Sequence, residues 1–284
     1  TLELLKAAEY YGAEVRFTRF ADFGYSKTLE ETLRNWDREE VLADVVRIIR
    51  QEKPHIILAK WRGDGRDGHG HHQAAGLIAR LAYEAAGDPK RFPEQIAEGL
   101  APWQPQKLYV NNRRASDDWT VEVPAGDWDP LLGRSYAQIA LDGLRHQRTQ
   151  GAGSAVSRPG AAIRYYKLAA SQVGLADKES SFFDRLPLQL EAYRPLAAAV
   201  TAARQSFKAQ SPASCGPALA RVLASVQELR KWQPGNPDLT IKERQAQEAL
   251  ASALGLELEV LVEPRERPQG PFSAFSPYET LQVA

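Results

Sequence analysis

The pattern of apolar and polar positions divides the chain into a first part in which helices alternate with strands and a later part of helices alone. Apolar residues recur at helical spacing over residues 1–11, 28–50 and 74–85, whereas residues 14–20 alternate and residues 55–59 form a short apolar run. Further strands are predicted over residues 106–110 and 119–123, and a helix over residues 135–150. Helices that alternate with strands indicate an α/β fold with a Rossmann-like, parallel sheet and flanking helices.

The later part begins after a glycine-rich linker at residues 151–160. Three helical stripes follow, which predict a helical appendage whose apolar faces form its core. Alternation returns at Leu256 and is followed by prolines, which is typical of the first strands of a β-region. We therefore expect an α/β domain over residues 1–155, a helical region over residues 156–255 and the start of a C-terminal β-region over residues 256–284.

Three of the five histidines lie in one glycine-rich stretch, residues 64–76, directly after a predicted buried strand. In open α/β sheets, ligands bind at the carboxyl ends of the strands. His69 and His72 are three residues apart, so on one helical turn they share a face. One ring can then bind a metal while the other donates or accepts a proton. The carboxylates of Asp64 and Asp67 are candidates to orient the imidazoles.

The spacing alone leaves a second interpretation open. A solvated, histidine-rich loop also chelates metal by accident, and no cysteine or glutamate lies near these histidines to complete a set of ligands. His55 at the start of a strand and His146 in a charged helix have ordinary structural interpretations.

The composition limits the classes of partner to be expected. Lys plus Arg and Asp plus Glu number 36 each, so no overall charge favours nucleic acid or an anionic membrane, and we expect a small or neutral molecule as the partner. No run reaches the ~18 apolar residues that a membrane span needs. Cys215 is the one cysteine, so no internal disulfide forms. Because the chain has no methionine and begins within a helical pattern, we expect it to be a segment of a longer protein.

The run from His69 to Gly76, His-Gly-His-His-Gln-Ala-Ala-Gly, resembles the second signature of the LmbE-like, or PIG-L, zinc-dependent de-N-acetylases, which usually reads His-Pro-Asp-His. Phe-Ala-Asp ending at Asp22 and Arg-Thr-Gln ending at Gln150 support the resemblance, which covers residues 1–160. It implies a Rossmann-like fold, a Zn²⁺ cofactor and removal of the acetyl group from small N-acetylglucosamine-type conjugates.

The resemblance also implies roles for single residues. His72 matches the zinc-ligand histidine, and His69 matches the histidine that stabilises charge developing on the amide oxygen. Gly70 and His71 stand where the family has Pro and Asp, so His71 inherits no role. A further set of polar residues is expected to orient these groups or to contact the substrate, namely Asp22, Asp64, Arg66 and Asp67.

One family signature is not in this sequence. The run Ala-His-Pro-Asp-Asp-Glu, which supplies two zinc ligands and the general-base aspartate, does not occur in these 284 residues. The implied reaction is metal-assisted amide hydrolysis, and we expect this segment alone to bind zinc weakly and to hydrolyse nothing.

Two rival interpretations belong to other classes. A non-catalytic carbohydrate-binding protein on the same fold would stack sugar rings on tryptophans, for which Trp61, Trp103, Trp119 and Trp128 are candidates, although ordinary packing also explains them. A nucleotide-binding Rossmann protein is disfavoured because no Gly-x-Gly-x-x-Gly turn is followed by a ribose-binding acid.

Overall fold

The structure is a computed structural model that describes residues 1–112, 118–154, 162–186 and 191–256. The contacts within the chain divide it into two units, Thr1–Pro187 and Leu188–Ala284. This division falls later than the predicted end of the α/β domain at residue 155, because a strand that the sequence pattern did not predict belongs to the first unit.

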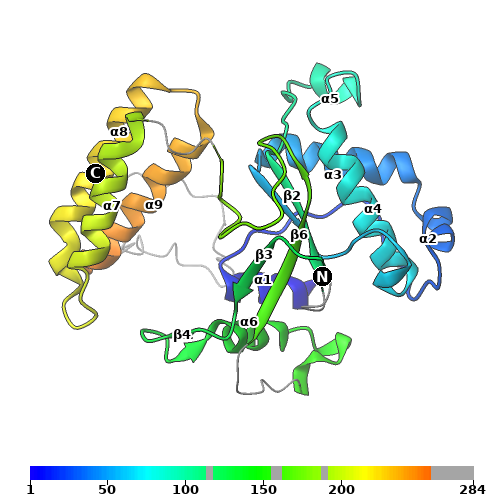
Figure 1. Ribbon diagram of the computed structural model, residues 1–284, viewed down its shortest axis with the longest axis horizontal. Coiled ribbons are helices and arrows are strands. Elements are labelled where there is room, and N and C mark those ends of the chain that lie inside the picture. Colours follow the sequence, from blue (N-terminus) through cyan, green and yellow to red (C-terminus); the bar gives the residue numbers. More distant parts are fainter. Residues whose placement is uncertain (113–117, 155–161, 187–190, 257–284) are drawn as a thin grey trace, which may run out of the picture. The chain divides into compact units, whose positions relative to one another are not determined.

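That first unit contains a four-stranded mixed sheet in the order β1-β2-β6-β3 (Figure 1). Its strands are β1 (Ile56–Ala59), β2 (Lys107–Asn112), β6 (Ile163–Ser171) and β3 (Val121–Pro124). Strand β1 runs parallel to β2, with Ile56 opposite Lys107, whereas β6 is antiparallel to both of its neighbours. The α/β class is confirmed, but the sheet has a single parallel pair rather than parallel strands throughout.

Strand β6 corrects the expectation that helices alone follow residue 160. Its nine residues include Tyr165 and Tyr166, which suit a pleated and half-buried surface. Strand β1 also differs from its prediction, because Leu58 is 49 % exposed and the strand is therefore not buried on both faces.

Helices flank this sheet. They are α1 (Leu2–Tyr11), α2 (Leu29–Asn35), α3 (Arg38–Glu52), α4 (Gly70–Ala85), α5 (Pro93–Ala97) and α6 (Tyr136–Leu144). Helix α4 packs on β1 and β2 through Ala59, Tyr83, Leu108 and Val110, while α2 and α3 pack against α4 and α1 packs against α6. Burial of each large apolar side chain in such clusters contributes about 1.5–3 kcal/mol.

Three local predictions in this unit were wrong. The expected helix over residues 135–150 ends at Leu144. The expected helix over residues 28–50 is two helices, because Trp36 is extended and the carboxylate of Asp37 accepts the N–H of Glu40 to start α3. Residues 14–20 contain no strand, and Arg16 and Arg19 of this segment instead pair with Glu52 and Asp44 of α3. A hairpin of β4 (Trp128–Asp129) and β5 (Arg134–Ser135) was not predicted.

A buried arginine links the end of α3 to the end of α4. Arg50 is fully buried and donates hydrogen bonds around the C-terminal end of α4, to the carbonyl oxygens of Ala85, Ala86, Asp88, Arg91 and Phe92 and to Oε1 of Gln95. Burial lowers the pKa of the Arg50 guanidinium. Four of these five carbonyls also accept a backbone N–H group, so the guanidinium adds a second donor there and links α3 to the end of α4.

A buried ion pair between Lys107 and Glu179 fixes the segment that follows β6. Lys107 Nζ lies 3.0 Å from Oε1 of Glu179, and both side chains are almost fully buried. Burial alone would raise the pKa of Glu179, but hydrogen bonds from Tyr109, Arg185 and Lys107 outweigh it and lower that pKa. Burial and the Glu179 carboxylate in turn raise the pKa of Tyr109.

The second unit is a bundle of α7 (Arg194–Ser206), α8 (Gly216–Trp232) and α9 (Pro237–Leu254). Small residues, among them Ala203, Ala218 and Ala246, form its core with Val222. Helix α9 begins at Pro237, because the side chain of Asn236 accepts the N–H of Asp238. The predicted β-region after Leu256 lies outside the described residues. No helix in the described ranges is both long and apolar enough to cross a membrane.

Candidate functional site

The site lies in the loop that joins the carboxyl end of β1 to the start of α4. This loop contains a short 3-10 helix, Gly65–Asp67. The carboxylate of Asp67, a residue only 4 % exposed, accepts hydrogen bonds from the backbone N–H groups of Arg62, Gly63 and Asp64 at 2.6 to 3.2 Å. The loop is therefore folded around one buried carboxylate.

Two glycines allow the loop to lie directly against α4. Gly63 has a φ of 89°, and a Cβ atom placed there would lie 2.7 Å from the backbone nitrogen of Leu77. A Cβ atom on Gly76 would lie 2.1 Å from the nitrogen of Gly63. Both positions require glycine because the loop and helix backbones are in contact.

His72 is oriented by this loop. Its Nδ1 lies 3.0 Å from the carbonyl oxygen of Asp67. A carbonyl oxygen only accepts, so Nδ1 carries the proton and, in the neutral ring, Nε2 carries the lone pair. The ring of Trp61 stacks on the imidazole at 3.4 Å between centroids and 16° between planes.

His69 lies beside His72 as the residue that precedes α4. The two imidazole centroids are 3.7 Å apart, and the ring of Tyr25 lies 5.3 Å from that of His69. Nδ1 of His69 is buried and accepts or donates no hydrogen bond within the described part of the chain. The structure thus brings together the two histidines that the spacing pairs.

His71, to which no role was assigned, connects α4 to the loop over residues 21–28. Its Nδ1 lies 2.9 Å from Oγ of Ser26, and its ring lies 4.5 Å from that of Phe23 and 4.9 Å from that of Trp36. Burial lowers the pKa of His71, which the carboxylate of Asp22 opposes. The histidine that departs from the family pattern therefore holds a neighbouring loop in place.

Gly70 departs from the family pattern for a related reason. Its N–H donates to the carbonyl oxygen of Ser26 at 3.0 Å, and a Cβ atom would lie 1.9 Å from the carbonyl oxygen of Thr28. Proline has no N–H and carries a ring at this place, so it would remove the hydrogen bond and collide with the loop.

The other predicted site residues are arranged differently from the expectation. Arg66 Nε donates to Oδ1 of Asp64 at 2.9 Å, and this guanidinium lowers the pKa of Asp64 to about 2. The hydrogen bonds of the Asp64 carboxylate thus go to the Arg66 side chain and to backbone N–H groups of the turn rather than to an imidazole. Asp67 contacts His72 through its carbonyl rather than its carboxylate. The exposed carboxylate of Asp22 lies 3.7 Å from Nε2 of His71.

Of the four tryptophans considered for sugar stacking, Trp61 alone contacts a site histidine. Trp103 packs in the core and donates to the carbonyl oxygen of Pro54, and Trp119 contacts Tyr165. Trp128 is 61 % exposed on the β4–β5 hairpin. His55 packs against Trp103 and His146 against Tyr10, in keeping with structural roles.

His72 meets the requirement for a metal ligand. Histidines that bind metals usually donate their second ring N–H to a carbonyl or carboxylate, which is the arrangement that Asp67 provides. Within the described residues, no group of three His, Cys, Asp or Glu side chains is placed to hold a metal ion. The residues present thus fit one ligand position rather than a complete set.

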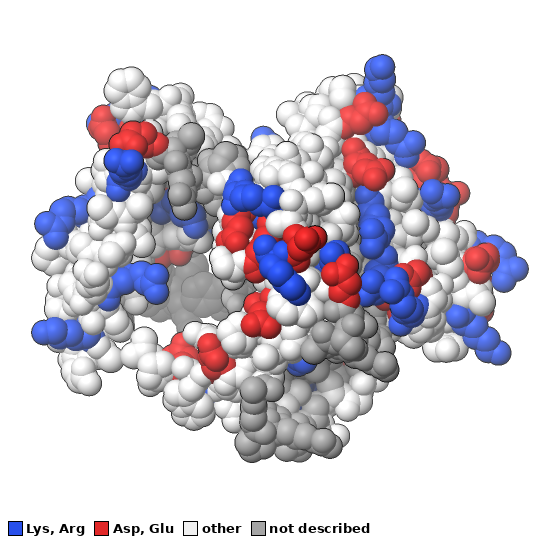
Figure 2. Space-filling view, viewed as in Figure 1, with Lys and Arg blue, Asp and Glu red and all other residues white. Residues whose placement is uncertain are grey.

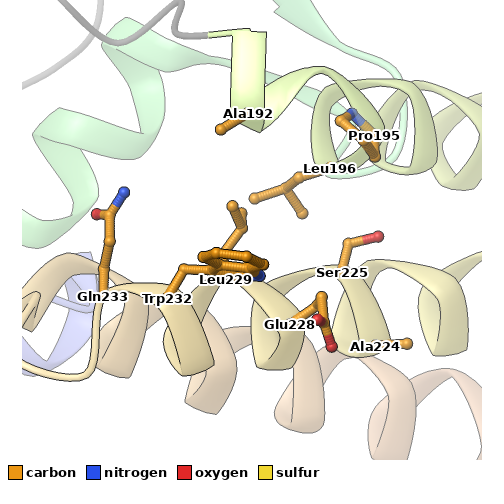
Figure 3. Close-up of a pocket in the computed structure, with 9 residues that line it drawn as sticks. All are labelled: Ala192, Pro195, Leu196, Ala224, Ser225, Glu228, Leu229, Trp232 and Gln233. Carbon is orange, nitrogen blue, oxygen red and sulfur yellow. The ribbon is translucent and has the colours of Figure 1, made fainter.

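The pocket in the second unit and the surface charge give no further information on this site. An apolar pocket in the second unit lies between α7 and α8, and no histidine lines it (Figure 3). Its lining includes Pro195, Leu196, Leu229 and Trp232. Basic and acidic side chains lie next to one another over much of the face in Figure 2, in keeping with their equal numbers.

Taken together, the fold and site define an α/β protein with a histidine pair at the carboxyl end of a strand, one ring of which is held at Nδ1 by a backbone carbonyl. Residues 1–83 match the PIG-L family, described as GlcNAc-PI de-N-acetylase. This match confirms the resemblance seen in the run from His69 to Gly76.

Curated relatives carry the same kind of name. The chain is 35 % identical over 102 residues to a 1D-myo-inositol 2-acetamido-2-deoxy-alpha-D-glucopyranoside deacetylase of Rhodococcus opacus, covering 34 % of this chain and 33 % of that protein. It is 30 % identical over 148 residues to deacetylase 2 of the same name from Saccharopolyspora erythraea, covering 46 % and 52 %. The chain therefore spans about a third to a half of the length of these relatives.

Proposed function

We propose that this chain contributes part of the active site of a zinc-dependent de-N-acetylase that acts on a small N-acetylglucosamine-type conjugate. The observation that carries the proposal is the contact of His72 Nδ1 with the carbonyl oxygen of Asp67, which directs the ring's lone pair to Nε2. The PIG-L match over residues 1–83 and the names of the relatives support the same activity. They do not favour a non-catalytic carbohydrate-binding protein.

In this proposal, Nε2 of His72 holds the metal. Zinc, when bound, polarises the amide carbonyl and lowers the pKa of a bound water to about 7. His69, whose ring lies against that of His72, donates a hydrogen bond to the oxyanion that develops on the amide oxygen. Trp61 covers one face of His72 and keeps its ring in place.

Asp22 and Tyr25 are proposed to contact the substrate. Both lie on the loop that His71 holds against α4, and Tyr25 is 71 % exposed beside His69. An exposed aromatic ring suits the apolar face of a sugar, and an exposed carboxylate accepts hydrogen bonds from its hydroxyl groups.

Zinc content distinguishes the roles proposed for His69 and His72. His72→Ala is expected to lose zinc, whereas His69→Ala is expected to keep zinc and to lose rate by 10²–10³-fold, the effect typical of one oxyanion donor. The measurement is zinc content together with acetate release, in a protein that contains this segment and binds zinc. Equal zinc content in the His72→Ala protein would reject the ligand assignment.

A further proposal concerns the segment itself. Since the run Ala-His-Pro-Asp-Asp-Glu does not occur in this sequence, we propose that these 284 residues alone bind zinc weakly and release no acetate. A family member that contains this run serves as the positive control. Turnover by the 284 residues at a rate close to that control would contradict the proposal.

A further inference from the structure

We propose that Asp67 is a positioning residue that fixes the tautomer of His72 by folding the β1–α4 loop around its own carboxylate. This inference rests on the proposed role of His72 as a metal ligand. It assigns to Asp67 an action through its backbone carbonyl, with the side chain as the support of that carbonyl.

The carboxylate of Asp67 binds three successive backbone N–H groups. Oδ1 accepts from Arg62, and Oδ2 accepts from Arg62, Gly63 and Asp64. A buried carboxylate held by several N–H donors forms stronger hydrogen bonds than a neutral acceptor does. The loop before Asp67 is therefore fixed to the side chain of Asp67.

The backbone of Asp67 is fixed from the other side as well. Its N–H donates to the carbonyl oxygen of Asp64 at 3.0 Å, which closes the 3-10 turn. Because both the side chain and the N–H of Asp67 are held, the direction of its carbonyl is set. That carbonyl points at Nδ1 of His72, 3.0 Å away.

A second contact to His72 depends on the same carboxylate. Arg62, whose N–H is bound by both carboxylate oxygens, directly follows Trp61, and the indole of Trp61 stacks on His72. Asp67 thus holds both the acceptor at the edge of the His72 ring and the backbone next to the indole on its face. Loss of the carboxylate is expected to release both contacts together.

The test measures the tautomer of His72 without any metal. The 284-residue protein is labelled with ¹⁵N-histidine, and two-bond ¹H–¹⁵N correlations are recorded well above the ordinary pKa of histidine, with His72→Gln assigning the signal. We expect the Nδ1–H tautomer in the wild type. In Asp67→Asn, whose amide N–H₂ would face backbone donors, we expect a mixture with the Nε2–H tautomer.

Asp64→Asn is the matched control, because it removes the charge of another carboxylate of the same turn, while the remaining Oδ1 can still accept the backbone N–H groups that this cap holds. It is expected to leave the His72 signal unchanged. Asp67→Glu keeps the charge and is expected to restore part of the Nδ1–H population, which also covers the case in which Asp67→Asn fails to fold. A wild-type Nε2–H tautomer, or an unchanged tautomer in Asp67→Asn, would overturn the proposal.

Zinc titration separates this inference from the proposed function. In a family protein that binds zinc through the equivalent segment, the Asp67→Asn change is expected to weaken zinc binding by about 10–100-fold, as for other groups that orient a ligand. A tautomer change without any zinc binding by His72 would refute the metal site and leave the positioning role of Asp67 standing.

Discussion

Replacement of Arg50 by methionine is expected to destabilise the first unit strongly. The guanidinium is fully buried and makes six hydrogen bonds, five of them to backbone carbonyls at the end of α4 and in the turn that follows. Methionine keeps most of the apolar stem and removes every donor. The carbonyls would then lie beside an apolar side chain, and the expected cost depends on how many of them find another partner.

The magnitude follows from the individual acceptors. The carbonyl of Ala86 keeps the N–H of Trp103, and the contacts with Asp88, Arg91 and Phe92 are only partly buried, so water can replace the donor there. The carbonyl of Ala85 keeps the N–H of Asp88, so Oε1 of Gln95 is the buried acceptor that loses its donor within the described residues. At about 1–3 kcal/mol for a buried group left unsatisfied, the expected loss is about 1–3 kcal/mol.

Arg47→Met provides the matched control on the same helix. Arg47 pairs with Glu98 at the surface, where such pairs contribute about 0–1 kcal/mol. Thermal unfolding is followed together with hydrogen exchange of the α4 amides, because exchange reports on this unit alone. At about 2–4 °C per kcal/mol for a domain of this size, Arg50→Met should lower the melting temperature by roughly 2–12 °C. A loss equal to that of Arg47→Met would refute the reasoning.

Three other changes test the site and its surroundings. Gly70→Ala places a methyl group against the carbonyl oxygen of Thr28. It is expected to destabilise the first unit by about 1–3 kcal/mol and to shift the His71 NMR signals. Gly65→Ala is the control, because a Cβ atom there meets open space. Trp61→Leu is expected to broaden the His72 ring signals in the NMR spectrum, because it removes the stacked ring; unchanged signals would contradict this. The pKa of Glu179 is lowered on folding, so its contribution is present above the ordinary pKa of a glutamate and is lost as the pH falls through the lowered value. Urea titrations at several pH values should therefore show a weaker acid dependence in Glu179→Gln, and an equal dependence would contradict the assignment.

The sequence predicted the elements that carry a strong periodic signal. Helix α4 and strand β2 lie close to their predicted positions, because long apolar stripes and short apolar runs are bounded by clear breaks. Strand β6 was missed because the glycine-rich stretch before it suggested a linker, while its position between β2 and β3 depends on contacts far away in the sequence. The break between α2 and α3 was missed because a cap at Asp37 interrupts an otherwise continuous apolar stripe.

The site was predictable in its residues but not in its hydrogen bonds. Spacing placed His69 and His72 on one turn, and the structure brings their rings together. Spacing could not show that the Asp64 carboxylate turns to Arg66 while Asp67 turns inward, because the two aspartates have the same chemistry and differ only in the path of the loop. The signal that was present is the capping pattern from Asp64 to Asp67, which predicts a tight turn with reciprocal side-chain bonds.

The two departures from the family signature are explained by one contact surface. At Gly70, the N–H and the missing side chain let the loop over residues 21–28 lie against the first turn of α4. At His71, the ring packs against Phe23 of that loop and Trp36 at the end of α2. Proline at position 70 would exclude the loop, and an aspartate at position 71 would bring a carboxylate among aromatic rings, where burial disfavours its charge. The substitutions are therefore coupled to the loop that carries Asp22 and Tyr25, so the departures alter the side of the site proposed to meet substrate and leave the contact of His72 with Asp67 in place.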